Sequence, residues 1–256
     1  MHPGEDIIGD GQLPNPYGDA ELLRRYAALG HDPAGVSYLS LGETWHSAAP
    51  GLVAALGEVP PHSHGYLLTP YGLPALQSVL RDYIPADHGL PPAGPGADYD
   101  VAVSQHSTRS SMYHYGRLLL EEQDAAASRP VAVCSSPGWD YPGVYSALGY
   151  DMRHFEVSPG RGYQPDPRDV EELLLKARRD TSGPVLLILN AQHNPTGADG
   201  EAAAVRAMVR AALAYDAALL VDDAYYAVHD PGTSPTPTLR ILLVPLVSQR
   251  VRRCRK

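Results

Sequence analysis

Apolar positions along this chain follow two different periodicities. Short apolar runs of the kind that form buried strands recur at residues 99–104, 130–136, 151–157, 184–190 and 217–223. Between them, apolar residues repeat at helical spacing over residues 110–123, 142–148, 166–180 and 201–215. Strands that alternate with helices in this way predict a mainly parallel sheet covered by helices on both faces. We therefore predict a three-layer α/β/α fold.

The first hundred residues are organised differently. Glycine and proline are frequent up to about residue 19, a helical pattern follows at 20–30, and an extended segment at 37–42. A second helical pattern covers residues 72–84, and the proline- and glycine-rich segment 85–100 predicts a loop. We expect an N-terminal arm ahead of the regular part of the chain.

Composition narrows the choice of partners. The 256 residues are 44% hydrophobic, which is enough for one large core or for one domain with a smaller attachment. The net charge of −9 argues against nucleic acid and against an anionic membrane, so we expect a small-molecule ligand. The two cysteines offer no disulfide framework, which fits a reducing, cytoplasmic compartment. We expect neither a signal peptide in MHPGEDIIGDGQ nor a membrane span.

Three of the predicted strands end in unusual polar residues. The segments are QHSTRSS after the first strand, NAQHNPTG after the fourth and VDDAYYAV at the fifth. Ligands usually bind at the carboxyl edge of such a sheet. Ser107 and Thr108 lie where a helix begins, and the free N–H groups there suit a phosphate, although an ordinary helix cap would use the same residues. No Walker loop is present in the sequence.

Two carboxylates follow the last buried strand. Asp222 and Asp223 come directly after AALLV, at the mouth of the sheet. A carboxylate in such a low-dielectric position needs a cationic partner. That partner could be a ligand, although a structural ion pair or a helix cap would meet the same need.

Taken together, these segments resemble those of a known enzyme family. NAQHNPTG, VDDAYY, the upstream PGWDYPGVYSALGY and the earlier GYLLTPYGLPAL together resemble the class I/II aminotransferases, which are fold-type I pyridoxal 5′-phosphate (PLP) enzymes. The similarity covers roughly residues 38–245. It implies that residues 41–256 are a PLP-binding large domain and residues 1–40 an N-terminal arm with part of a small domain.

The resemblance also implies roles for individual residues. Asp222 would hold the ring nitrogen of PLP protonated, and Asn194 and Tyr225 would bind its phenolic oxygen. Trp139 would stack on the ring, although it could also be a core tryptophan. Ser107 and Thr108 would hold the phosphate.

Further positions extend the resemblance beyond the ring. Tyr66 resembles a tyrosine that reaches the phosphate site of a neighbouring subunit, which implies a homodimer, although its distance from Gly72 is one residue longer than is common. Gly42 resembles a small residue beside the substrate, and His193 one in a layer behind the ring. His62 and His64 lack a second cluster at zinc spacing, so we expect no metal.

The lysine that this family attaches to PLP is not found in its usual sequence surroundings. The chain has two lysines, and Lys176 lies in an amphipathic helix where it should be solvated. Lys256 stands 34 positions after Asp222, a spacing that would admit it as the catalytic lysine, but QRVRRCRK lacks the small residues usual there. This tail adds five positive charges to a net −9, so residues 1–248 carry −14. We expect a truncated product, from a change of reading frame near residue 249.

The expected function is amino-group transfer from an amino acid to a 2-oxo acid, with Asp222 and Lys256 as catalytic candidates. Two alternatives stay open: a non-catalytic remnant that keeps the PLP pocket, or another fold-type I activity such as a C–S lyase. A large domain without its last strands would have an open sheet edge and exposed apolar surface, which predicts poor solubility.

Overall fold

The structure is a computed structural model of the chain. It describes residues 23–32, 49–66, 68–69, 72–104, 106–123, 127–228, 232–234, 236–238 and 240–242. The chain divides into two compact units, Met1–Tyr66 and Leu67–Lys256. In the first unit, residues 23–28 are helical and α3 covers Pro50–Gly57. The extended segment predicted at 37–42 lies outside the described residues, and the domain division after residue 40 stays a prediction.

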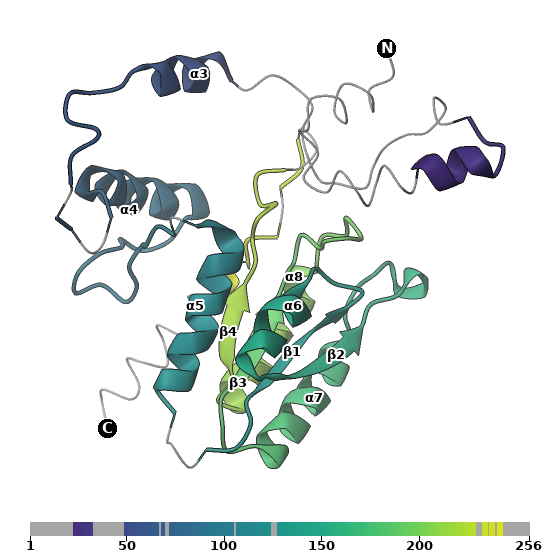
Figure 1. Cartoon of the computed structure of the whole chain (residues 1–256). Coiled ribbons are helices and arrows are strands. Elements are labelled where there is room, and N and C mark those ends of the chain that lie inside the picture. The colour runs from purple at the N-terminus through teal and green to yellow at the C-terminus, as the bar shows by residue number, and fades with distance from the viewer. Residues whose placement is uncertain are drawn as a thin grey trace. The chain divides into compact units, whose positions relative to one another are not determined.

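A parallel sheet forms the centre of the second unit (Figure 1). Its strands are β1 (Val131–Ser136), β2 (Asp151–Glu156), β3 (Val185–Leu189) and β4 (Ala218–Val221), in the spatial order β2-β1-β3-β4. All three pairings are parallel. Since consecutive parallel strands need a crossover, each of the first three strands is followed by a helical connection.

Helices cover both faces of this sheet. The elements on one face are α5 (Ser107–Glu121), α6 (Tyr141–Tyr145) and the 3₁₀ turn η2 (Ser146–Leu148). The elements on the other are α7 (Pro167–Asp180) and α8 (Ala202–Ala214), and the 3₁₀ turn η3 (Pro159–Arg161) follows β2. Alternate strand residues belong to separate cores: Leu187 packs toward α7 and α8, whereas Leu186 packs toward α5 and α6. The predicted three-layer α/β/α fold is confirmed.

Two of the predicted elements are wrong. Residues 99–104 were expected to be a strand, but the described ones are irregular and pair with no strand in the described part of the chain. A strand gains its hydrogen bonds only from a neighbour, so the apolar pattern alone cannot form one. The segment expected as a loop from residue 85 begins inside α4 (Pro74–His88), which ends at Gly89 with φ of 61°. Pro85 lies in the last turn of this helix, where it lacks the N–H that would bond to the carbonyl of Arg81.

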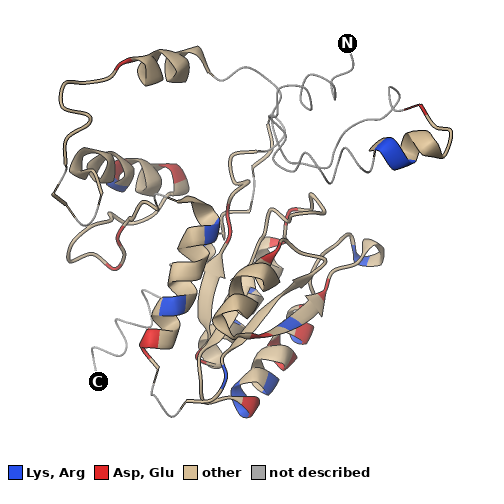
Figure 2. Ribbon diagram, in the orientation of Figure 1, with Lys and Arg blue, Asp and Glu red and all other residues tan. Residues whose placement is uncertain are grey.

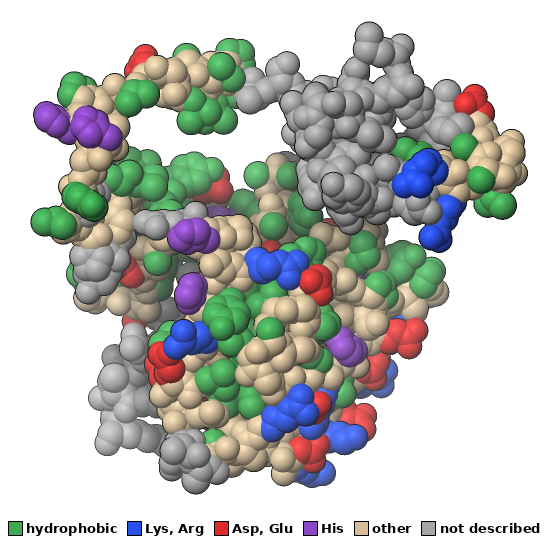
Figure 3. Space-filling model, viewed as in Figure 1, with side chains coloured by type: hydrophobic (Ala, Val, Ile, Leu, Met, Phe, Trp, Pro, Cys, Tyr) green, Lys and Arg blue, Asp and Glu red, His purple; other side chains and the backbone are tan. Residues whose placement is uncertain are grey.

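α4 differs from the helices on the sheet because none of its residues is buried. Leu76, Val79 and Tyr83 are exposed, and apolar side chains gather over α4 in Figure 3. Within the described residues, β4 has a strand neighbour on one side only, and all four of its residues are partly exposed. Both surfaces are of the kind that promotes association between chains. Among the described helices, none has the length and apolar character to cross a bilayer.

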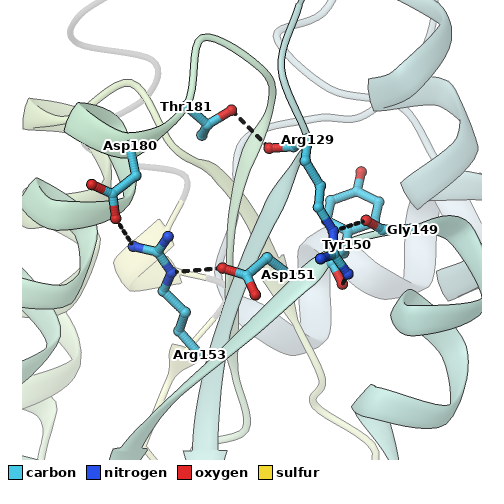
Figure 4. Close-up of polar contacts among 7 residues, drawn as sticks. All are labelled: Arg129, Gly149, Tyr150, Asp151, Arg153, Asp180 and Thr181. Carbon is cyan, nitrogen blue, oxygen red and sulfur yellow. Dashed lines mark hydrogen bonds and ion pairs between the residues drawn. The ribbon is translucent and has the colours of Figure 1, made fainter.

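Polar groups tie the connections together at the amino end of the sheet (Figure 4). Arg153 forms ion pairs with Asp151, at 3.0 Å from Nε, and with Asp180, at 2.8 Å from Nη1. The hydroxyl of Thr181 donates to the carbonyl of Arg129 at 2.7 Å. The end of α7, which carries residues of both charge signs along its length (Figure 2), is thus attached to the starts of β1 and β2.

Thr181 provides a test of this anchoring. Its side chain is buried, and besides donating to Arg129 it accepts from the main-chain N–H of Gly183 at 2.8 Å. Thr181→Val keeps the shape but leaves both main-chain groups unpaired, so we expect the free energy of unfolding to fall by about 1–3 kcal/mol. Urea denaturation measures the loss. Thr181→Ser is the control that keeps the hydroxyl, and a valine variant as stable as the serine variant would contradict the prediction.

Candidate functional site

Asn190 joins two strand ends at the carboxyl edge of the sheet. Its side-chain N–H donates to the main-chain oxygen of Asp222 at 2.8 Å, while its Oδ1 accepts from the main-chain N–H of Asn194 at 2.7 Å. The end of β4 and the turn after β3 are therefore held by one amide. Sequence reasoning passed over Asn190, although an amide directly after five buried strand residues was a signal for such a role.

The turn after β3 brings Asn194 to Tyr225. The Asn194 amide donates to the Tyr225 hydroxyl at 3.1 Å, across 31 positions of the sequence. Gly197, at φ of 71°, closes the turn by donating its N–H to the carbonyl of His193 at 2.8 Å. Asn194 and Tyr225 both line a cavity of about 730 Å³ whose wall also includes Asp199. Two residues that the motifs predicted together thus lie together beside an open volume.

Asp222 is oriented by a tyrosine that the sequence analysis did not single out. The hydroxyl of Tyr141, at the start of α6, donates to Oδ2 of Asp222 at 2.8 Å. Burial raises the pKa of Tyr141, and the neighbouring Asp222 charge raises it further, so the phenol stays a proton donor. We expected a cation beside this carboxylate. Within the described residues its partner is a neutral hydroxyl, which leaves the negative charge of Asp222 unbalanced.

Trp139 lies between the first turns of α5 and α6. The guanidinium of Arg109 sits 4.5 Å from the centre of the indole ring, and its Nη1 pairs with Asp140 at 2.9 Å. Asp140 in turn caps α6 by accepting from the N–H of Gly143 at 3.0 Å. Trp139 also packs against the core that contains Tyr141. The indole is therefore fixed on more than one side.

Ser107 and Thr108 are exposed in the first turn of α5. The N-cap position belongs to His106, whose side chain makes no capping bond, so the two hydroxyl residues do not act as the cap there. Ser107 has φ of 85°, in the left-handed region, and its carbonyl accepts from the Ser104 hydroxyl at 3.2 Å. Since α5 runs antiparallel to β1, this turn lies at the carboxyl edge of the sheet, as the Arg109–Asp140 pair also shows.

The remaining predicted residues are distributed as follows. Tyr66 ends the first unit and is 99% exposed. Gly42 and Lys256 lie outside the described residues. Lys176 is the one lysine in the described part of the chain, and it is exposed on α7. The described residues contain no group of three or more potential metal ligands.

Asp223, the residue after Asp222, has a carboxylate in an unfavourable environment. Both of its carboxylate oxygens are buried without a hydrogen-bond partner among the described residues. The nearby hydroxyl of Thr238 donates instead to the carbonyl of Thr236 at 3.1 Å. Burial raises the pKa of Asp223; the neighbouring His88 opposes this shift, and the charge of Asp222 adds to it. The edge of the sheet therefore holds one oriented carboxylate and one that is poorly solvated.

Comparison with known proteins identifies relatives of this arrangement. The family described as aminotransferase class I and II matches residues 119–251. Aspartate/prephenate aminotransferase of Thermus thermophilus is 25% identical over 157 residues, which make up 61% of this chain and 36% of that protein.

Solved structures share the fold. A double mutant of Thermus thermophilus aspartate aminotransferase has a TM-score of 0.64 at 20% identity, covering 88% of this chain and 53% of that one. Alanine aminotransferase from Pyrococcus furiosus has a TM-score of 0.64 at 15% identity, covering 93% and 54%. The chain thus spans about half the length of these structures and about a third of the Thermus relative.

The unpartnered carboxylate leads to a prediction about stability. Asp223→Asn removes a buried charge, so we expect the free energy of unfolding at neutral pH to rise by about 0.5–1 kcal/mol, a small gain because water reaches part of the residue. The folded-state pKa of Asp223 is raised, so the destabilisation is complete above that pKa, decreases as the pH falls below it and is gone below the ordinary pKa of an aspartate. Urea denaturation from neutral to acidic pH should show the two curves converging. A variant no more stable than the wild type at neutral pH would refute this account.

Proposed function

We propose, from the premise that this chain belongs to the aminotransferase class I and II family, that its residues 41–256 form part of a PLP-binding large domain. Enzymes of this family generally depend on PLP. The reaction would be transfer of an amino group from an amino acid to a 2-oxo acid. It would be carried out by a longer protein, since this chain spans about half the length of the solved structures.

One observation carries the proposal. Asn194, Asp222 and Tyr225 are joined through the Asn194–Tyr225 hydrogen bond and through Asn190, which binds the main chain of both Asn194 and Asp222. An amide N–H and a phenol O–H side by side suit an anionic oxygen such as the phenolate of the cofactor. The unbalanced Asp222 carboxylate suits a ring nitrogen that must carry a proton. The donors present therefore fit the two polar edges of a pyridoxal ring.

Other residues fit the rest of the cofactor. The free N–H groups and the hydroxyls of Ser107 and Thr108 at the start of α5 would hold a phosphate. Trp139 offers an indole for stacking. When bound, PLP supplies an electron sink for the bonds at a substrate's α-carbon. The chain's own part would be to hold the ring nitrogen protonated through Asp222 and to stabilise the phenolic oxygen through hydrogen bonds from Asn194 and Tyr225.

Two further proposals concern the substrates and the subunits. The Thermus relative's name, aspartate/prephenate aminotransferase, supports an amino acid and a 2-oxo acid as the substrate pair. The full exposure of Tyr66 is compatible with its proposed reach into a second subunit of a homodimer. Gly42 beside the substrate and a cytoplasmic location stay predictions.

A second candidate is a domain that binds PLP without turnover. The observation in its favour is that Lys176, the single lysine among the described residues, is exposed on α7 and belongs to no part of the site. Amino-group transfer needs a base that moves a proton at the substrate's α-carbon, and a lysine does this in the family the chain resembles. Without such a base the same pocket would bind the cofactor and go no further.

Titration of the full chain with PLP tests the proposed function. We expect a change in visible absorbance that saturates, and Asp222→Asn should weaken the affinity about ten- to a hundredfold, since it removes a charge-assisted hydrogen bond. Asp216→Asn is the matched control, because Asp216 is exposed and its φ of 52° suits asparagine equally well. The absence of any absorbance change in the wild type would end the proposal.

Borohydride reduction of the loaded chain, followed by peptide mapping, separates the two candidates. Modification of Lys256 would favour the aminotransferase. Bound cofactor that is removed by dialysis after reduction would favour binding without turnover.

Tyr141 gives a further prediction about the same site. Tyr141→Phe removes the hydrogen bond that orients Asp222, so we expect cofactor affinity to fall about three- to tenfold. Tyr145→Phe is the control, because the hydroxyl of Tyr145 is buried without a hydrogen-bond partner among the described residues. Absorbance titration of both variants measures the difference. Equal affinities would contradict the role assigned to Tyr141.

A further inference from the structure

His193 uses both nitrogens of its ring, although it lies within a turn. The side chain is buried, with Nδ1 at 2.8 Å from the hydroxyl of Thr196 and Nε2 at 2.9 Å from the hydroxyl of Ser135. Its main-chain N–H donates to the carbonyl of Ala198 at 2.8 Å, so the backbone of this residue is held as well. The ring therefore has one defined orientation between two separate segments of the chain.

The imidazole is neutral at ordinary pH. Burial lowers the pKa of His193, and a hydrogen bond with the main chain of Pro137 only partly opposes this effect. A neutral ring has one donor and one acceptor nitrogen. One of the two hydroxyls, that of Ser135 or that of Thr196, therefore accepts from the ring and the other donates to it.

The two segments that this ring connects are the two sides of the proposed cofactor site. Ser135 and Pro137 lie at the end of β1, in the chain that leads directly to Trp139. Thr196 belongs to the turn that presents Asn194. Both hydrogen bonds of the ring are buried or partly buried, where a lost partner is costly. A change in the length or bonding of this side chain removes a hydrogen bond that holds one segment to the other.

We propose that His193 is a positioning residue that sets the separation between Trp139 and Asn194, and so the space that the cofactor ring enters. The proposal rests on the proposed function. His193 acts through Trp139 and Asn194, and the neutral ring works as a spacer with a donor on one side and an acceptor on the other.

Variants that keep one half of the connection provide the test. His193→Gln places an amide near the position of Nε2 and can still reach Ser135, but it loses Thr196. Thr196→Val removes the same bond from the other side, and Thr196→Ser restores the hydroxyl. We expect His193→Gln and Thr196→Val each to weaken PLP binding about three- to tenfold and to shift the absorption of the bound cofactor. Thr196→Ser should bind like the wild type.

The double variant makes the test specific. If the lost bond is the one between His193 and Thr196, then Thr196→Val adds nothing in the His193→Gln background, whereas Ser135→Ala weakens binding further. Thermal melting of each chain without cofactor separates this role from a general loss of stability. Variants that melt earlier but keep the wild-type affinity and absorption would overturn the positioning role. Failure of the wild type itself to bind PLP would instead overturn the proposed function, and this role with it.

Discussion

The side-chain amide of Asn190 is the interaction on which the candidate site depends. Parallel strands deliver their carboxyl ends to one edge of a sheet, but this alone does not fix how the loops beyond them meet. Asn190 binds the main chain of Asp222 with its N–H and the main chain of Asn194 with its oxygen. The turn after β3, which carries Asn194, and the chain after β4, which begins at Asp222, are thereby attached to each other close to where each leaves the sheet.

Buried polar groups at the two edges of the sheet are paired in different ways. At the amino edge, Thr181 satisfies main-chain groups, and Arg153 forms ion pairs with both Asp151 and Asp180, so each of these carboxylates has a cationic partner. At the carboxyl edge, Asp222 receives only a neutral hydroxyl, and Asp223 receives no hydrogen bond among the described residues. A protein interior tolerates such an imbalance where a positively charged ligand can complete it. The charge distribution thus points to the same edge as the motifs.

The site is also layered. Asn194, Tyr225 and Asp222 form the set that would face a ring. Behind them, Asn190 binds Asn194 and Asp222, Tyr141 binds Asp222, and His193 binds the turn that carries Asn194, through hydrogen bonds of 2.7 to 2.9 Å. Every supporting residue comes from a strand end, a first helical turn or a turn closed by main-chain bonds. Rigid elements of this kind keep recognition groups oriented before a ligand arrives, which lowers the entropy lost on binding.

The sequence by itself determined the layers and the order of strands and helices along the chain, because periodicity is a local property, and its resemblance to the aminotransferases proposed Asn194, Asp222 and Tyr225 as the recognition set. Only the tertiary structure decided the rest. Residues 99–104 carry a strand pattern but pair with no strand in the described part of the chain, and α4 runs through Pro85 to His88 although proline lacks a helical N–H. Asn190, Tyr141 and His193 acquire their roles from partners 3 to 81 positions away. Such hydrogen bonds depend on which side chains folding brings together, so even where a residue stands out in the sequence, as His193 does, its partners do not.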